Sequence, residues 1–265
     1  KIIKLLLPLR LKFLCFSYFY QYLKFDEIKT IFFFLKKKKV KNGLMIDVGS
    51  NIGTSAEFFL LNKWMVHCFE PDKDNFRIIN KRFTKFSNIR SNNLAISDKS
   101  GSLKFYRSSI SDGINSLIKF HESHNYEYKV NVIRLDTYLN KNNIKKIDFL
   151  KIDVEGNDFN VLKSIGLNSV SPTIIMMEYE DAKTKNIGIK INDILEYLIS
   201  NNYNFLVSEW FPIQRYGHNH KWKKIHKIND FSSVDPDSWG NIIGVKDYKL
   251  CVELFDFINS KNKQS

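Results

Sequence analysis

From residue 44 onward, short apolar runs alternate with segments whose apolar residues recur at the spacing of a helix. The short runs predict buried strands at Leu44–Val48, Met65–Phe69, Asn88–Ala95, Ile147–Ile152, Thr173–Met177, Phe205–Val207 and Ile242–Val245. The periodic segments predict helices at Ser55–Asn62, Asp74–Phe83, Asp158–Ile165 and Ile191–Ser200. Strands that alternate with helices indicate an α/β fold, in which a mostly parallel sheet is covered by helices on both faces.

Two stretches depart from this alternation. Between residues 98 and 146, the segments SGSLKFYRS and YKVNVIRL alternate like half-exposed strands and predict an inserted β-hairpin. The connection from Glu209 to Asn241 lacks helical periodicity, and long loops of this kind are often functional. No Pro-, Gly- or Ser-rich linker divides the chain. We therefore expect one domain over residues 42–250, followed by a C-terminal tail over 251–265.

The first 41 residues are apolar and basic together. Their longest uncharged run, Phe13–Leu23, has eleven residues, whereas a membrane-spanning helix needs about 20. No small-residue cleavage site of a secretory signal follows the apolar run. The pattern predicts a helical, amphipathic arm that either covers an edge of the core or lies on a membrane interface.

Composition changes this picture in one respect, the distribution of charge. The chain has 265 residues, with 41 Lys+Arg, 28 Asp+Glu and a net charge of +13. Residues 1–41 hold eleven basic and two acidic residues, a net +9, which leaves only +4 for the remainder.

The three cysteines, Cys15, Cys68 and Cys251, form no disulfide framework and no metal pair, which indicates a reducing compartment. We expect a cytoplasmic protein, with peripheral contact to the inner membrane face through residues 1–41 left open.

The strongest local motif is Leu44-Met-Ile-Asp-Val-Gly-Ser-Asn-Ile-Gly-Thr54, which predicts a buried strand, a glycine-containing turn and a helix. Ligands of α/β sheets bind where strands end in such turns. The glycines are four residues apart and do not form the G-x-G-x-x-G of dinucleotide enzymes. With an aspartate before them, they suit a ligand that carries an ammonium group and no pyrophosphate, such as S-adenosylmethionine. The candidate cofactor residues of this motif are Asp47, Gly49, Ser50, Asn51 and Gly53.

Two further strand ends extend the predicted cofactor site. Glu70 follows the second strand, 21 residues after Gly49, and an acidic side chain at that spacing can accept both ribose hydroxyls of a nucleoside. Asn93 and Ala95, at the end of the third strand, could meet the adenine edge. The same residues also make an ordinary turn, so this third signal carries less information.

Carboxylates follow the next two predicted strands. Asp153 and Glu155 come after the fourth, and Glu178 after the fifth. They could hold the methionine ammonium, orient a substrate hydroxyl or act as a base, although Glu155 could also only cap the next helix. Such a cluster could bind a divalent ion, but no ligand spacing demands one, and we assign no metal ligand.

The connection after Glu209 supplies the candidate acceptor-binding residues Arg215, His218, His220 and Trp222. Aromatic faces with His, Arg and Asn donors suit a polyhydroxylated ring, and cations suit the phosphate of a nucleotide-linked sugar. The alternative is a solvated loop whose tryptophans pack on the domain. Zinc is disfavoured because no cysteine accompanies the histidines.

Together these motifs resemble the FkbM family of S-adenosylmethionine-dependent methyltransferases. The landmarks are IDVGSNIGTSAEFF at 46–59, FEPDKDNF at 69–76, NLAISDKSGSLKFY at 93–106, RLDTYL at 134–139 and DFLKIDVEGNDFNVLKS at 148–164. The resemblance implies a Rossmann-like class I methyltransferase fold with a seven-stranded sheet whose last strand is antiparallel. It also implies O-methylation of hydroxyls on sugars, glycans or polyketides. By this resemblance Asp47, Gly49, Asn51, Gly53 and Glu70 bind the cofactor, and Asp153 lies beside the transferred methyl group.

We therefore predict an S-adenosylmethionine-dependent O-methyltransferase acting on a sugar, glycan or nucleotide-sugar acceptor. A nucleic-acid methyltransferase is an alternative prompted by the net charge, but that charge is concentrated in the arm, and we expect no nucleic-acid partner. A second alternative is a non-catalytic module of the same fold that docks to a membrane or a partner through its basic arm. The sequence leaves the oligomeric state open.

Overall fold

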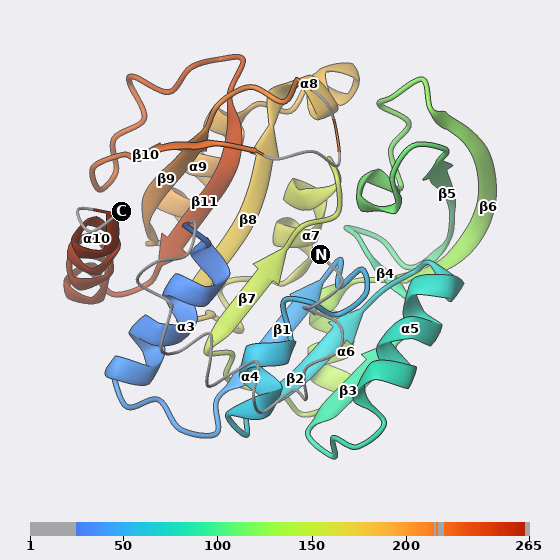
Figure 1. Cartoon of the computed structure of the whole chain (residues 1–265), viewed down its shortest axis with the longest axis horizontal. Coiled ribbons are helices and arrows are strands. Elements are labelled where there is room, and N and C mark those ends of the chain that lie inside the picture. Colours follow the sequence, from blue (N-terminus) through green and yellow to red (C-terminus); the bar gives the residue numbers. More distant parts are fainter. Residues whose placement is uncertain (1–24, 215, 217–219, 263–265) are drawn as a thin grey trace.

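The central layer of the molecule is an eight-stranded sheet with the strand order β10-β9-β11-β8-β7-β1-β2-β3. The computed structural model describes residues 25–214, 216 and 220–262 (Figure 1). The strands of the sheet are β1 (Leu44–Val48), β2 (Met65–Phe69), β3 (Ile89–Asn92), β7 (Phe149–Ile152), β8 (Ile174–Glu180), β9 (Asn204–Trp210), β10 (Trp222–Ile225) and β11 (Trp239–Val245).

Strands β3, β2, β1, β7 and β8 pair in parallel, while β11 is antiparallel to both β8 and β9. This is the class I methyltransferase arrangement, and its last strand is antiparallel as predicted. The predicted number of strands was wrong, because β10 adds an eighth at the edge, antiparallel to β9. Its sequence, Trp-Lys-Lys-Ile, is only half-buried and contains no apolar run. An edge strand is covered on fewer sides than a central one, so its pattern is not that of a buried strand.

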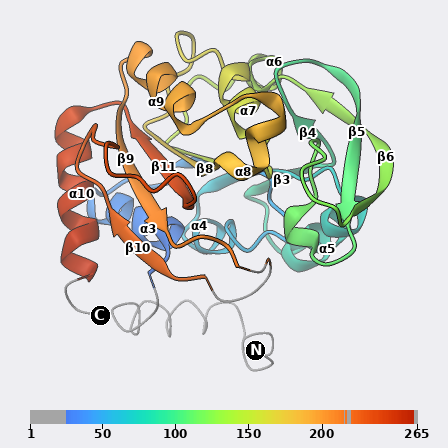
Figure 2. The same cartoon turned by 90° about the horizontal axis from the view of Figure 1, so that it is seen from above.

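Helices cover both faces of this sheet, and Figure 2 shows them on its two sides. One core cluster packs the sheet against α6 (Leu135–Lys141), α7 (Asp158–Ser164) and α9 (Ile191–Ser200). The other packs it against α3 (Glu27–Lys37), α4 (Glu57–Leu61), α5 (Lys73–Phe83) and α10 (Tyr248–Asn262). The short helices α8 (Asp181–Thr184) and η3 (Lys185–Ile187) follow β8.

The described part of the N-terminal arm belongs to the core. Asp26 caps α3 by accepting a 3.0 Å hydrogen bond from the backbone amide of Lys29. On the inner face of α3, Ile31 and Phe32 are 0% and 1% exposed. Of the two roles considered for the arm, covering the core is therefore the one that residues 27–37 perform. Residues 1–24 lie outside the described residues, and the prediction for them stays a prediction.

The C-terminal segment also belongs to the domain. The expected tail begins inside α10, and Cys251, Leu254 and Ile258 of that helix are at most 1% exposed. Residues 251–262 are thus a packed helix rather than a tail, because every third or fourth residue is apolar and faces the core. Helices α10 and α3 lie side by side (Figure 1). Across the described ranges, no helix is both long enough and apolar enough to cross a membrane.

The predicted hairpin is present beside the main sheet. Strands β5 (Gly101–Ser108) and β6 (His124–Ile133) pair in antiparallel fashion, and β4 (Ala95–Ile96) completes a small sheet of order β4-β6-β5. The connection between β5 and β6 contains the short helix η2 (Asp112–Ile114).

Candidate functional site

The main sheet opens into a cleft of about 550 Å³ where β1, β2, β7 and β8 end. This volume lies within the roughly 300–1,000 Å³ of small-molecule sites. Two other segments also line the cleft, the connection between β5 and β6 and the segment between β9 and β10. The β5–β6 connection, which belongs to the inserted hairpin, and the segment between β9 and β10, here called the late loop, thus form part of the wall of the cleft.

The glycines of the turn after β1 are required by chain packing. Gly49 has a φ of +80°, and a Cβ there would lie 1.8 Å from the carbonyl oxygen of Asp153. Gly53 has a φ of +78°, and its Cβ would lie 2.6 Å from the ring of Phe83. Gly49 lines the cleft, whereas Gly53 does not. Gly53 thus packs closely against α5, and its predicted contact with a cofactor stays a prediction.

Glu70 is the best-placed predicted cofactor residue. It lines the cleft and is 5% exposed. Its Oε2 accepts a 2.7 Å hydrogen bond from the amide of Asn51, and its Oε1 a 2.8 Å bond from the amide of Asp72. Burial raises the pKa of Glu70 to about 8, although these two hydrogen bonds act in the opposite direction. A carboxylate offers about four acceptor positions, so two remain for ligand hydroxyls.

The neighbouring predictions fall around Glu70. Asn51 lines the cleft with a φ of +48°, a conformation that is uncommon outside glycine. Asn93 donates hydrogen bonds of 2.9 and 3.0 Å to the carbonyl oxygens of Glu70 and Pro71, and so holds the end of β2 in place. Ala95 lines the cleft and packs in one apolar cluster with Phe105 of the hairpin. This apolar wall suits a flat base.

Asp47 and Ser50 lie behind the cleft, which corrects the expectation that they contact a ligand. Asp47 is 0% exposed, and its cross-strand partner is Lys151, whose Nζ lies 3.3 Å from Asp47 Oδ1. Burial raises the pKa of Asp47, and the Lys151 cation acts against that rise. Lys151 also lies 3.2 Å from Asp153 Oδ2 and donates to the carbonyl oxygen of Gly49. Ser50 donates to the Asp47 carbonyl and accepts from the amide of Phe69, so it closes the turn.

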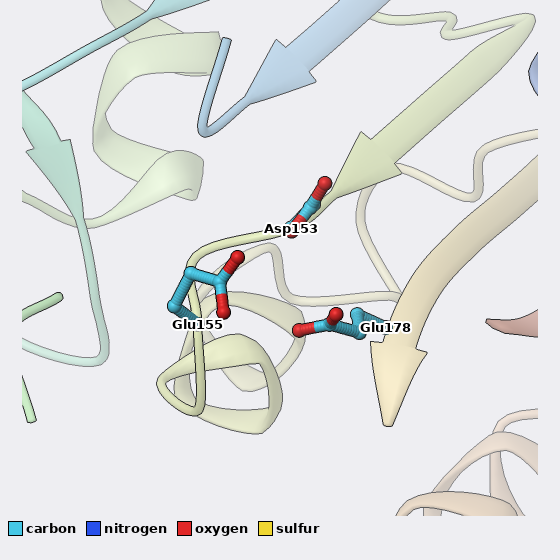
Figure 3. A group of neighbouring side chains, drawn as sticks. All are labelled: Asp153, Glu155 and Glu178. Atoms are coloured by element: carbon cyan, nitrogen blue, oxygen red, sulfur yellow. The ribbon is translucent and has the colours of Figure 1, made fainter. Parts of the chain in front are cut away.

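The three predicted catalytic carboxyls converge in the cleft. Figure 3 shows Asp153 and Glu155 on the turn that follows β7, with Glu178 on β8 facing Glu155. One oxygen of each lies within 4.8 Å of the other two. Glu155 has a φ of +59°, and non-glycine residues in this region cluster at functional sites. Pairing of β7 with β8 therefore brings together residues that are more than twenty positions apart.

A lysine that the sequence reasoning missed lies among these carboxyls. Lys183, in α8, is 2% exposed, and its Nζ lies 2.6 Å from Glu155 Oε2 and 2.7 Å from Glu178 Oε2. It also lies 3.0 Å from Glu180 Oε2. Burial alone would lower the pKa of Lys183, but the three glutamates outweigh it and raise the pKa, so the side chain stays charged.

The carboxyls respond to the same burial. It raises the pKa of Glu155 to about 7, with Lys183 acting against the rise and Asp153 adding to it. It raises the pKa of Glu178 well above its usual range, and the neighbouring Glu155 raises it further. Burial therefore favours the protonated form of both carboxyls, and the Lys183 cation favours their charged form.

Of the predicted acceptor-binding residues that the structure describes, one lines the cleft and one does not. His220 lines the cleft, with its ring 5.0 Å from that of Trp239. Trp222 does not line it: its indole donates to Ser208, and its ring packs 4.6 Å from Phe25. For Trp222 the packing alternative is therefore correct. Arg215 and His218 lie outside the described residues.

Sequence reasoning also missed two aromatic residues of the cleft, Tyr216 and Trp239. The hydroxyl of Tyr216 donates a 2.9 Å hydrogen bond to Glu180. Tyr216 stands in the long connection from Glu209 to Asn241. The length of that connection was the sequence signal that could have identified Tyr216.

Known proteins resemble this chain in sequence and in fold. The model of the FkbM methyltransferase domain matches residues 47–206. The chain is 27% identical over 175 residues to the 2-O-methyltransferase NoeI of Sinorhizobium fredii (strain NBRC 101917 / NGR234). The aligned region covers 59% of this chain and 71% of that protein. Among solved structures, a precorrin-6y C5,15-methyltransferase from Geobacter metallireducens superposes with a TM-score of 0.41 at 10% identity, covering 80% of this chain and 85% of that one. The magnesium protoporphyrin IX methyltransferase of Synechocystis, with bound SAM, has a TM-score of 0.43 at 8% identity, with coverage of 83% and 78%.

Proposed function

The chain belongs to the FkbM methyltransferase family, and from that premise we propose that it transfers a methyl group from S-adenosylmethionine to a hydroxyl of a sugar or glycan. The observation that carries this proposal is the convergence of Asp153, Glu155 and Glu178 in the same cleft as Glu70. The Glu70 carboxyl suits the ribose of a nucleoside, and the group of three carboxyls suits a reacting hydroxyl.

The residues present fit the cofactor. Glu70 is a nearly buried carboxyl with two free acceptor positions, as two ribose hydroxyls require. Ala95 and Phe105 offer an apolar wall for adenine, and Asp153 offers a carboxylate for the methionine ammonium. When bound, S-adenosylmethionine supplies a methyl group on a positively charged sulfur, already activated for displacement.

Glu155 and Glu178 then bind the acceptor hydroxyl and remove its proton. The pKa of Glu155 is about 7, and a base with a pKa near the working pH is the most effective. Glu155 accepts the hydroxyl proton, and Glu178, which faces it from β8, orients the hydroxyl by hydrogen bonding. A positioned base contributes about 10²–10⁴-fold, and alignment of the reactants contributes about 7–11 kcal/mol.

A sugar acceptor is supported by the side chains around these carboxyls. Tyr216, His220 and Trp239 line the cleft and combine aromatic faces with polar tips. Pockets of this kind bind the apolar face of a ring while a few polar groups fix its orientation. The similarity to a protein named 2-O-methyltransferase also supports transfer to oxygen.

The proposal is tested by incubating the protein with S-adenosylmethionine and one acceptor class at a time. The panel contains oligosaccharides, nucleotide-linked sugars, transfer RNA and buffer alone. We expect release of S-adenosylhomocysteine only with the saccharides, and mass spectrometry of the product should show the gain of one methylene.

The matched variants are Glu155→Gln, which removes the proposed base, and the exposed Glu127→Gln on the hairpin as a control. Methyl transfer to RNA alone would overturn the acceptor assignment. Absence of cofactor binding by the folded protein would instead favour the non-catalytic alternative.

A further inference from the structure

Lys183 joins four segments of the cleft. Its Nζ contacts Glu155 on the turn after β7 and both Glu178 and Glu180 on β8, at 2.6 to 3.0 Å. The ring of Phe120, from the β5–β6 connection, and that of Tyr216, from the late loop, each lie 5.8 Å from the same ammonium. A cation faced by aromatic rings and carboxylates gains from both kinds of contact.

The surrounding carboxyls have the spacing of a cation site. Oxygens of Asp153, Glu155 and Glu178 lie within 4.8 Å of one another, a spacing that suits a hard divalent ion bound by oxygen ligands. Two of these three side chains already place an oxygen within 2.7 Å of the Lys183 ammonium. The positive charge that such a cluster requires is thus supplied by the chain itself.

Resting on the proposed function, we propose that Lys183 is the positioning residue of the acceptor end. Its ammonium takes the place of a divalent cation beside Glu155 and Glu178 and holds both carboxyls in their working geometry. The enzyme then methylates its acceptor without a metal ion, and removal of the ammonium creates a metal site.

The position of Lys183 supports a role in alignment. It stands five residues after Glu178, beyond the end of β8, and is 2% exposed. Through Glu180, which accepts from the Tyr216 hydroxyl, it also connects to the late loop. Loss of the ammonium would leave Glu155, Glu178 and Glu180 facing one another without the donor that they share.

The experiment compares wild type with Lys183→Ala, Lys183→Arg and the exposed neighbour Lys185→Ala. Each protein is dialysed against EDTA and assayed for methyl transfer, with and without added Mg²⁺ or Mn²⁺. Terbium ion alone is titrated into each protein, and luminescence sensitised by nearby Tyr216 reports binding at the cluster.

We expect EDTA to leave the wild-type rate unchanged and terbium to find no site in the cluster. Lys183→Ala should lose about 100-fold in rate, as expected for misplaced catalytic groups. It should also gain a terbium site and recover at least part of its rate with Mg²⁺ or Mn²⁺. Lys183→Arg should retain more activity than Lys183→Ala, and Lys185→Ala should match wild type throughout.

Two results would overturn the inference while the proposed function stands. One is a wild-type rate that EDTA abolishes and Mg²⁺ restores. The other is a folded Lys183→Ala protein that binds no terbium. If Lys183→Ala does not fold, the EDTA and terbium measurements on wild type still decide the question. If wild type methylates no acceptor, the proposed function fails, and the terbium titrations still decide whether Lys183 occupies a cation site.

Discussion

The backbone amide of Asn51 donates a 2.7 Å hydrogen bond to Oε2 of Glu70, which ties the turn after β1 to the end of β2. Asn51 holds a φ of +48° to make this contact. The positive φ of the turn and the position of the buried Glu70 carboxyl are therefore maintained together. Two elements adjacent in the sheet become one rigid wall of the cleft.

Replacement of Glu70 by Gln should weaken cofactor binding. Gln offers only one acceptor oxygen, and its amide group opposes the amide of Asn51 or Asp72. A buried hydrogen-bonding group left without its partner costs about 1–3 kcal/mol, so we expect a loss of about 5- to 150-fold in affinity. Calorimetric titration with S-adenosylhomocysteine measures it, with Glu127→Gln as the control. Equal affinities for Glu70→Gln and wild type would remove Glu70 from the ribose site.

The rate of methyl transfer should follow the ionisation of Glu155. Its pKa is raised from 4.5 to about 7, so the ionised base is scarce at pH 5 and predominates at pH 8. The value of kcat/KM should rise about tenfold per pH unit below 7 and level off above it. Glu155→Gln should lose about 10²–10⁴-fold and the rise through pH 7. An unchanged profile in this variant would assign the base to another group.

Gly49 and Gly166 form a matched pair for the cost of packing. Both have positive φ, +80° and +64°, but an added Cβ meets the Asp153 carbonyl only at Gly49 and nothing within 4 Å at Gly166. Gly166→Ala should cost about 1–2 kcal/mol from backbone strain alone. Gly49→Ala should cost about 2–5 kcal/mol, because overpacking adds to the strain. Urea unfolding measures both, and similar costs would argue against the close approach.

Deletions at the N-terminus should separate membrane contact from folding. Residues 1–24 contain five basic residues and no acidic one, and each basic side chain near an anionic surface contributes about 1 kcal/mol. Deleting residues 1–24 should reduce flotation with phosphatidylglycerol-containing vesicles. Deleting residues 1–35 should unfold the protein, because Ile31, Phe32 and Phe34 are core residues. Equal flotation of wild type and the shorter deletion would exclude this membrane contact.

The parallel strands could be predicted because helices cover both of their faces. In β1, for example, Ile46, Val48 and Met45 are at most 1% exposed. Ile46 and Val48 pack in the core cluster on one face of the sheet, and Met45 packs in the cluster on the other face. Such strands read as continuous apolar runs. Strand β10 escaped prediction because its lysines, Lys223 and Lys224, stand at an edge.

The residues that line the cleft could be predicted where they stand next to the end of a predicted strand. Glu70 and Asp153 follow their strands directly, and Glu155 stands two positions after Asp153. Asp47 misled because a buried charge paired across strands with Lys151 has the same sequence appearance as a ligand-binding one. Lys183 could not be found, since its partner Glu155 is 28 positions away and meets it only after β7 pairs with β8.

The contact between α3 and α10 has a consequence for synthesis of the protein. The rings of Phe34 and Phe257 lie 5.7 Å apart, and Lys38 pairs with Glu253. Phe257 emerges 223 residues after Phe34, which at about 5–20 residues per second is a delay of roughly 11–45 s. Throughout that interval the apolar face of α3 lacks its final cover on the ribosome. Completion of the core around α3 therefore waits until α10 has left the exit tunnel.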